Sequence, residues 1–285
     1  MVGILLPIGL ITMGDKPNKN LGQHWLKDRA VLTKIAAYAK IEKDTVLEIG
    51  PGPGFLTSVL LENAAKVVAV EFDRELATNL ASSVLAKLEV VNADFLQFDL
   101  STLPRGYKVV ANIPYYITNK IIMKLLTAEN KPTVAVLLVQ KEVAERLAAE
   151  PGEMSILSVA AQLYSTVTLG EIVPAEMFTP PPKVDSQVVI LRPKSHKLRP
   201  CKNCKKDYKD RAYKDIDEKQ FFRVVKAGFS ARRKKLRSSL AGGLNISKPD
   251  AEKLLERASI DPNLRAQDLS LGDWHNLVKQ SKISL

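Results

Sequence analysis

Apolar and polar positions alternate in blocks along the first half of the chain. Short apolar runs rich in β-branched residues occupy residues 45–49, 66–70, 87–91, 107–111 and 133–139. Some of these runs are separated by segments whose apolar residues recur at helical spacing, such as 55–61 and 75–85. Strands that alternate with helices form a parallel sheet through right-handed crossovers, so the pattern predicts a doubly wound α/β domain.

The pattern changes further along the chain. The β-rich runs 165–173 and 186–192 are separated only by a turn and the sequence "FTPPPK", which predicts an antiparallel edge to the sheet. The next segment is polar and without period, and helical spacing resumes at Glu218. The expected parts are a disordered leader over 1–18, an α/β domain over 19–191, a basic linker over 192–217 and a helical domain over 218–285.

The composition suits an intracellular protein with a large core. Of the 285 residues, 46% are hydrophobic and only two are cysteines, which is typical of a reducing compartment. The N-terminal run "MVGILLPIGLITM" is shorter than the roughly 20 residues that span a bilayer, and it lacks the features of a secretory signal. We therefore expect a cytoplasmic protein without a membrane anchor, with Met13 as an alternative start of translation.

The positive charge is concentrated in one part of the sequence. The formal net charge is +11, and residues 192–240 alone hold 18 basic and 5 acidic residues. The flanking parts are nearly neutral, with net charges of −2 over 1–191 and 0 over 241–285. Such a block is typical of a protein that binds a polyanion, and nucleic acid is the usual one in the cytosol.

Within this block, "FFRVVKAGFSARRKKLRSSL" predicts a helical basic surface. Five cations between residues 232 and 237 have no acidic residue among them. A solvated helix face is the ordinary explanation of a charge run, but the mutual repulsion of these cations would destabilise a helix without a bound polyanion. The residues expected to contact RNA phosphates are Arg223, Lys226, Arg232, Arg233, Lys234, Lys235 and Arg237.

Glycine and acidic residues follow the first three predicted strands. The run Gly50-Pro51-Gly52-Pro53-Gly54 follows the first strand, Glu71 follows the second, and Asp94 follows the third. The carboxyl ends of parallel strands meet at one edge of a sheet, where open α/β sheets bind ligands. There, Glu71 can accept both hydroxyls of a ribose, and Asp94 can accept an adenine amino group beside Phe95.

These strand ends predict a site for an adenine nucleoside. NAD remains open as the ligand, although the glycine spacing differs from G-x-G-x-x-G and nothing in the chain resembles hydride-transfer chemistry. The residues expected to contact the cofactor at these strand ends are Gly50, Gly52, Glu71, Phe72, Asp94 and Phe95.

The fourth predicted strand ends in Asn112-Ile113-Pro114-Tyr115 at the same edge. An amide oxygen can accept a hydrogen bond from an exocyclic amino group, as asparagine does with adenine. Pro114 favours extended backbone at Ile113, which leaves that carbonyl as a second acceptor, and Tyr115 offers a ring for base stacking. The four residues therefore predict a catalytic site that orients an aromatic amine for attack on a methyl group without a charged base. The alternative is a capped strand-to-helix turn.

Longer motifs extend this pattern over nearly the whole sequence. They are "KNLGQHWL" (19–26), "EIGPGPGFLT", "VEFDREL", "NADFLQFD", "MFTPPPKVDSQVV" and "FSARRKKLRSSL", in this order. The strand ends resemble class I methyltransferases that use S-adenosylmethionine. The motifs together resemble the KsgA-type small-subunit rRNA adenine N6-dimethyltransferase family from about residue 16 onward, and the erythromycin-resistance methyltransferases of large-subunit rRNA are related to it.

The resemblance implies a Rossmann-like, seven-stranded sheet, mostly parallel with one antiparallel strand, and a small helical domain. It implies closure of the loop around Gln23 over the site. It makes Phe178 a candidate second wall for a flipped base, with core packing as the alternative, and a structural role remains the alternative for His24. The cofactor contacts that it implies are His24, Leu26, Gly50, Glu71, Asp94 and Asn112.

Two features depart from the family pattern. Tyr116 stands where Asn or Gln is common, which bears on whether one or two methyl groups are added. Cys201 and Cys204 form a C-x-x-C pair in an insertion. One such pair is half a zinc site and only His196 lies nearby, so we expect no metal.

The expected function is dimethylation of N6 of two adjacent adenosines near the 3′ end of small-subunit (16S-type) rRNA, with a role in ribosome biogenesis. The number and neighbourhood of the adenosines come from the resemblance alone. The alternatives are a large-subunit rRNA methyltransferase of the erythromycin-resistance type, a DNA methyltransferase, or an assembly factor whose methylation is incidental. The expected partner is rRNA in a pre-30S-type particle, and the protein is expected to be a monomer.

Overall fold

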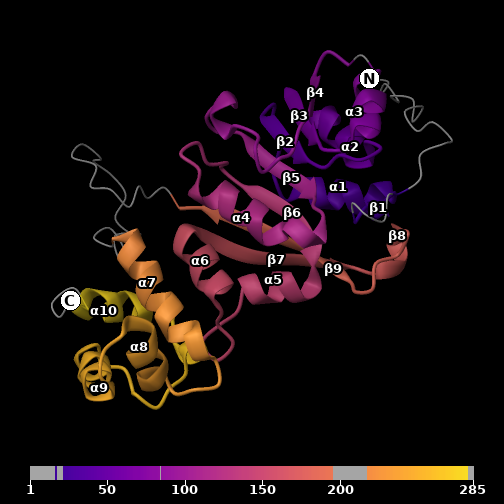
Figure 1. Ribbon diagram of the computed structural model, residues 1–285. Coiled ribbons are helices and arrows are strands. Elements are labelled where there is room, and N and C mark those ends of the chain that lie inside the picture. Colours follow the sequence, from indigo (N-terminus) through magenta and orange to yellow (C-terminus); the bar gives the residue numbers. More distant parts are fainter. Residues whose placement is uncertain (1–16, 18–21, 84, 195–216, 282–285) are drawn as a thin grey trace. The chain divides into compact units, whose positions relative to one another are not determined.

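The computed structural model describes residues 17, 22–83, 85–194 and 217–281 (Figure 1). These residues divide into two compact units, which are described separately. The first unit holds the chain up to Glu145 together with Ser165–Pro193, and the second holds Arg146–Tyr164 and the chain from Lys194. Nearly all of the expected leader and of the expected linker lies outside the described residues, as do His196, Cys201 and Cys204.

A seven-stranded sheet forms the centre of the first unit, in the order β4-β3-β2-β5-β6-β9-β7 (Figure 1). Neighbours from β4 to β6 pair in parallel, whereas β9 pairs antiparallel with both β6 and β7. The predicted sheet, mostly parallel with one antiparallel strand, is thereby confirmed. The strands are β2 (Thr45–Ile49), β3 (Lys66–Glu71), β4 (Leu88–Asn92), β5 (Lys108–Asn112), β6 (Ala135–Gln140), β7 (Ser165–Val173) and β9 (Ser186–Pro193).

Both faces of the sheet are covered. Consecutive residues of its central strands point to opposite faces, and both kinds are buried. Val46 and Val110 join one cluster with Leu32 and Leu60 of the helices α1 and α2, while Leu47 on the other face is also fully buried. Right-handed crossovers place α4 on the face opposite α2. The helices of this unit are α1 (Arg29–Ala37), α2 (Phe55–Asn63), α3 (Arg74–Ala81), which ends four residues before its predicted end, and α4 (Thr118–Thr127).

A two-stranded ribbon brings the N-terminal segment to the sheet. β1 (Trp25–Leu26) pairs antiparallel with β8 (Phe178–Thr179), with Leu26 opposite Phe178. Both of these side chains are buried in the same core cluster as α1 and α2. The ribbon thus fixes residues 22–26 beside a segment that is some 150 residues away in the sequence.

The second unit is helical. Its core contains fully buried Phe221, Leu236 and Trp274, and the indole of Trp274 stacks on Phe229. Its helices are α6 (Ile156–Tyr164), α7 (Glu218–Gly228), α8 (Leu236–Leu244), α9 (Lys248–Arg257) and α10 (Leu271–Ser281), while α5 (Lys141–Leu147) spans the division between the units. No helix within the described ranges is both long and apolar enough to cross a membrane.

The division differs from the predicted domains at residues 146–164, which group with the helical unit. The reason is the packing of α6: the Tyr164 ring stacks on Phe222 of α7, and the Tyr164 hydroxyl donates a hydrogen bond to Glu218. The sequence could not show this, because α6 directly precedes a strand of the sheet and has the length of an ordinary crossover helix.

The predicted basic helix is interrupted. α7 ends at Gly228, a short 3₁₀ turn covers Phe229–Ala231, and α8 begins only at Leu236. Four of the cations, residues 232–235, therefore lie on a turn, and all four are exposed. The expectation that these cations sit on a continuous helix was wrong, because the chain turns between two helices that pack on each other.

Among the residues expected to contact RNA, Arg237 differs from the others because it has an acidic partner. Its Nη1 lies 2.7 Å from Glu252 Oε1 of α9, and both side chains are partly buried. Lys235 Nζ donates to Asn263 Oδ1 at 2.7 Å. In contrast, no ion pair or hydrogen bond within the described chain occupies the side chains of Arg223, Lys226, Arg232, Arg233 and Lys234.

Candidate active site

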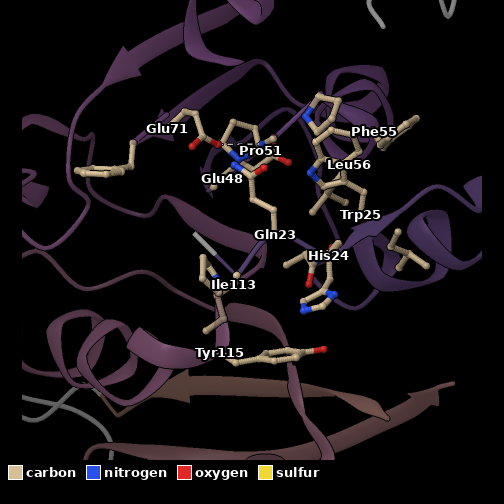
Figure 2. A pocket seen from close by; sticks show the side chains of 18 of the residues that line it. Gln23, His24, Trp25, Glu48, Pro51, Phe55, Leu56, Glu71, Ile113 and Tyr115 are labelled. Carbon is tan, nitrogen blue, oxygen red and sulfur yellow. Dashed lines mark hydrogen bonds between the residues drawn. The ribbon is translucent and has the colours of Figure 1, made fainter. Parts of the chain in front are cut away.

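A cavity of the first unit lies where the strand order reverses. From β2 the chain proceeds through β3 and β4 on one side, then returns to β5 and β6 on the other. Open α/β sheets bind ligands at such switch points, outside the carboxyl ends of the strands. The cavity is lined by the N-terminal segment Gly22–Leu26, the turn after β2, the end of β3 and residues 112–116 after β5 (Figure 2).

The glycine turn after β2 depends on backbone conformations that favour glycine. Gly52 has φ +56°, and its N–H donates to Glu71 Oε2 at 2.9 Å. Gly54 has φ +89°, and a Cβ on it would lie 2.7 Å from Leu80 Cδ1 of α3. The turn therefore presents bare backbone to the cavity and leads into α2, which starts without a side-chain cap.

Glu71 at the end of β3 is held by backbone donors. Its Oε1 accepts from Asp73 N and its Oε2 from Gly52 N, both at 2.9 Å. Burial nevertheless raises the pKa of this carboxyl, which is only 6% exposed. Each oxygen keeps a further lone pair, so the carboxylate can still accept hydroxyl donors such as those of a ribose.

Glu48 within β2 is a second buried carboxyl beside the first. It is 1% exposed, and neither of its oxygens accepts a hydrogen bond of good geometry. Burial raises the pKa of Glu48 to about 8; the Thr57 hydroxyl offsets part of this rise, and the charge of Glu71 adds to it. A buried carboxyl without donors is costly unless it is neutral or meets a ligand.

Asn112 at the end of β5 has a fixed amide orientation. Its Nδ2 donates to the backbone oxygen of His24 at 3.1 Å. Because a carbonyl oxygen can only accept, the amide nitrogen must face His24, and Oδ1 is left as an acceptor beside the cavity. The next carbonyl, Ile113 O, also accepts no hydrogen bond from the described residues. Two neutral acceptors thus follow one another at this strand end.

Tyr115 and His24 form a stacked pair beside these acceptors. Their ring centroids are 5.7 Å apart with an interplanar angle of 20°, and Figure 2 shows the tyrosine ring below the imidazole. The Tyr115 hydroxyl pairs with Ser186 Oγ at 2.7 Å, and burial raises the pKa of Tyr115. His24 Nδ1 donates to Pro180 O at 2.7 Å. This hydrogen bond holds the imidazole in place, which agrees with the alternative that His24 has a structural role.

The structure brings most of the candidate site residues to this one cavity. Gln23 extends across it from the N-terminal segment, and its Nε2 makes a long contact of 3.5 Å with Asp73 Oδ2 (Figure 2). Phe72 lies at the rim and is 62% exposed. The candidates that line the cavity are Gln23, His24, Leu26, Gly50, Gly52, Glu71, Phe72, Asn112, Ile113, Pro114 and Tyr115.

Three candidates do not line the cavity. Asp94 Oδ1 accepts from Leu96 N at 2.8 Å and so caps its own turn. Phe95 is 4% exposed, and the ammonium of Lys124 lies 5.3 Å from its ring centroid. Phe95 therefore packs below Lys124 in this structure and offers no free face to a ligand.

Phe178 is the third of these candidates. It is 3% exposed and belongs to the core cluster beneath the β1–β8 ribbon. A buried ring cannot form a wall for an incoming base. The placement therefore agrees with the alternative for Phe178, which was core packing. The ring instead supports Leu26, its partner across the ribbon.

Glu48 and Trp25 line the cavity but were not among the candidates. The signal for Glu48 was present in the sequence, because glutamate in the middle of an apolar strand is rarely fully buried without a reason. Trp25 gave no such signal. Its Nε1 is buried without a hydrogen-bond partner, close to where a Cβ on Gly52 would lie.

The charges around the cavity favour a cationic ligand. Two carboxyls, Glu48 and Glu71, line it, and no lysine or arginine does so among the described residues. The pyrophosphate of NAD would add negative charge beside these carboxyls, whereas S-adenosylmethionine, with a sulfonium, an ammonium and a carboxylate group, has a net positive charge. The orphaned oxygens of Glu48 and the bare backbone at Gly52 suit such a donor. No cluster of metal-ligand residues occurs in the described ranges.

The sheet and its cavity define a class I methyltransferase. A sequence profile of the family described as "Ribosomal RNA adenine dimethylase" matches residues 14–282. The chain therefore belongs to the ribosomal RNA adenine dimethylase family, and the expected enzyme class and family are confirmed. The methyl donor is S-adenosylmethionine.

Individual relatives agree with this assignment. Over 269 residues the chain is 38% identical to "Ribosomal RNA small subunit methyltransferase A" of Dehalococcoides mccartyi, covering 92% of this chain and 87% of the relative. A crystal structure of a dimethyladenosine transferase from Plasmodium falciparum is similar with a TM-score of 0.73 and 28% identity, covering 89% of this chain and 96% of the other. A crystal structure of the 23S rRNA methyltransferase ErmE gives a TM-score of 0.69 and 28% identity, with coverages of 90% and 98%.

Proposed function

We propose that the protein dimethylates N6 of two adjacent adenosines near the 3′ end of small-subunit rRNA. The similarity to small-subunit methyltransferases over most of both chains supports this substrate. The observation that carries the chemistry is the pair of neutral acceptors, Asn112 Oδ1 and Ile113 O, beside a cavity that suits the methyl donor.

The two acceptors match the two hydrogens of an exocyclic amine. With both N–H bonds directed at Asn112 Oδ1 and Ile113 O, the nitrogen lone pair of the adenine amine turns away from them. Bound S-adenosylmethionine supplies the electrophilic methyl group. Neither acceptor takes up a proton, so the chain contributes position and polarisation. After the methyl group has been transferred, the cationic nitrogen loses its proton to solvent.

Tyr115 would stack the flipped adenine. One face of its ring is turned towards His24, so the base uses the other face. The hydroxyl contact with Ser186 holds the ring plane, and the raised pKa of Tyr115 keeps the phenol neutral at physiological pH. Tyr116 is 65% exposed and lines the cavity close to Gly22.

The five unpaired cations of the second unit would contact RNA phosphates. Arg223 and Lys226 lie on α7, and residues 232–234 lie on the turn that follows. Because Arg237 is paired with Glu252, its charge is partly neutralised, and it contributes less to phosphate binding than was expected.

Removing three of these cations should weaken RNA binding at every sequence. The triple variant Arg232→Ala, Arg233→Ala, Lys234→Ala is expected to lower the slope of log affinity against log salt by about 2 to 3, because about 0.7–0.9 counterions are released per phosphate contact. The measurement is a salt titration of binding to small-subunit rRNA. A matched triple variant, Lys248→Ala, Lys253→Ala, Lys279→Ala, removes the same charge from exposed positions of α9 and α10 and should retain the slope. Equal slopes for the two variants would contradict the assignment.

The substrate can be tested directly. Unmethylated small subunits and large subunits are incubated with the protein and labelled S-adenosylmethionine, and the modified nucleosides are mapped. N6,N6-dimethyladenosine at adjacent positions near the 3′ end of the small-subunit rRNA is expected. Modification of the large subunit alone would favour the erythromycin-resistance type of activity, for which the likeness to ErmE is the supporting observation.

A role in ribosome assembly is part of the proposal. We propose that the protein acts as a cytoplasmic monomer on a pre-30S-type particle. An assembly factor with incidental methylation is the alternative, and a catalytically inactive variant that still supports subunit maturation would favour it.

A further inference from the structure

Glu48 is a buried acid for which the methyl-transfer chemistry described above has no use. It lines the donor cavity, and both of its carboxyl oxygens lack hydrogen-bond partners. Its neighbour Glu71 differs, because two backbone N–H groups stabilise its ionised form. If the two buried carboxyls share one negative charge, Glu71 is the one that keeps it, and Glu48 is the one that holds the proton.

No cation among the residues that the structure describes balances an ionised Glu48. The packed elements present Glu71 from β3 and the uncharged Thr57 from α2. Across the cavity, the titratable groups are His24 of the N-terminal segment and Tyr115 and Tyr116 after β5, and no lysine or arginine lines the cavity within the described chain. His24 is turned to Pro180 O through its Nδ1. A charge on Glu48 therefore needs a partner from outside the described residues, and a cationic ligand in the cavity can supply it.

We propose that Glu48 holds a proton in the donor-free enzyme and releases it to solvent when the cationic methyl donor enters the cavity. The O–H bond of the carboxylic acid breaks, the proton passes to the buffer, and the carboxylate that remains faces the positive charge of the donor. No electrons are transferred, and no further reactant is needed. The inference rests on the proposed function, because S-adenosylmethionine supplies the cation.

Because Glu48 releases a proton on binding, the affinity of the protein for the methyl donor depends on pH. The raised pKa of Glu48, about 8, means that the acid is protonated at neutral pH and below. Binding must then expel the proton, so affinity falls as pH falls. Over the range from 6 to 7, one released proton corresponds to about a tenfold loss of affinity per pH unit. In this range the α-amino group of the donor stays protonated, since such groups titrate near pH 7.7–8.0.

The first test counts protons on the unaltered protein. Titration calorimetry with S-adenosylmethionine is carried out at pH 6.5 in two buffers of different ionisation enthalpy. The expected difference in heat corresponds to about one proton released per donor bound. Heats that do not depend on the buffer overturn the inference. Because this test uses no variant, its outcome does not depend on how a substitution folds.

The second test compares two substitutions. Glu48→Gln keeps the size of the side chain and removes the acid, so it should release one proton fewer than the unaltered protein and lose about one unit of slope in log affinity against pH. Glu42→Gln changes an exposed glutamate just before β2 and should retain both values. An unchanged proton count in Glu48→Gln assigns the proton to another group and overturns the inference.

The outcomes separate this inference from the proposed function. Donor binding without proton release overturns the role of Glu48 and leaves the methyltransferase assignment intact. If the unaltered protein binds no S-adenosylmethionine at all, both are overturned. Methyl transfer to rRNA is measured independently of either titration.

Discussion

Asn112→Ala is expected to lower kcat for methyl transfer by about 10²–10³-fold, the usual cost of removing one preorganised polar group from a reacting centre. The substitution removes one of the two acceptors for the adenine amine and also the hydrogen bond from Nδ2 to His24 O. Donor affinity should change far less, because the groups that we expect to hold the donor, the two carboxyls and the glycine turn, lie on β2, on β3 and just after β2. The measurements are single-turnover methylation of small-subunit rRNA and calorimetric binding of S-adenosylmethionine.

Two further variants sharpen this test. Asn112→Asp keeps an acceptor but places carboxylate oxygen against the carbonyl of His24, so it should be as inactive as the alanine variant. Asn119→Ala removes an exposed amide on α4, only seven residues away, and should retain full activity. Near-normal turnover in Asn112→Ala would contradict the role given to this residue, whatever the other variants do.

Gly243→Ala is expected to destabilise the helical unit by about 1–3 kcal/mol or more, the range for overpacked cores. A Cβ on this residue of α8 would lie 2.5 Å from Ala227 Cα and 2.8 Å from Ala227 O. These are backbone atoms of α7, which cannot rotate away as a side chain can. The helices α7 and α8 therefore have to separate to admit one methyl group.

The neighbouring glycine supplies a matched control. A Cβ on Gly242 meets nothing within 4 Å, so Gly242→Ala should raise the free energy of unfolding by about 0.5–1 kcal/mol through the helix propensity of alanine. Chemical denaturation followed by far-ultraviolet circular dichroism measures both variants. Equal effects of the two substitutions would show that the close approach of α8 to α7 does not govern stability.

Much of the fold could be predicted because its signals are local. The runs that form β2, β3 and β5 are continuous and rich in β-branched residues. The observed ends of these strands differ from the predicted ends by no more than one residue. The break between α7 and α8 and the grouping of α6 with the helical unit could not be predicted. Both depend on contacts between segments that are distant in the sequence, such as Tyr164 with Glu218.

The candidate site shows the same limit. Residues such as Gly50, Glu71 and Asn112 were found because the carboxyl ends of parallel strands must share one edge. Phe95 was placed in the site by its position at the end of the third strand, and Phe178 by the family resemblance alone, but packing buries both rings in the protein interior. Whether a side chain faces a cavity or a core is decided by its partners across the fold, which the sequence pattern does not contain.

The hydrogen bond between Asn112 and His24 links the orientation of the Asn112 amide to the position of the N-terminal segment. His24 belongs to the segment that the short β1–β8 ribbon anchors, and its backbone oxygen fixes the amide that receives the substrate. The N-terminal segment Gly22–Leu26 therefore helps to fix the orientation of the Asn112 amide. If this segment left the sheet, the Asn112 amide would lose the hydrogen bond that fixes its orientation, so we expect methyl transfer to require that residues 22–26 are docked.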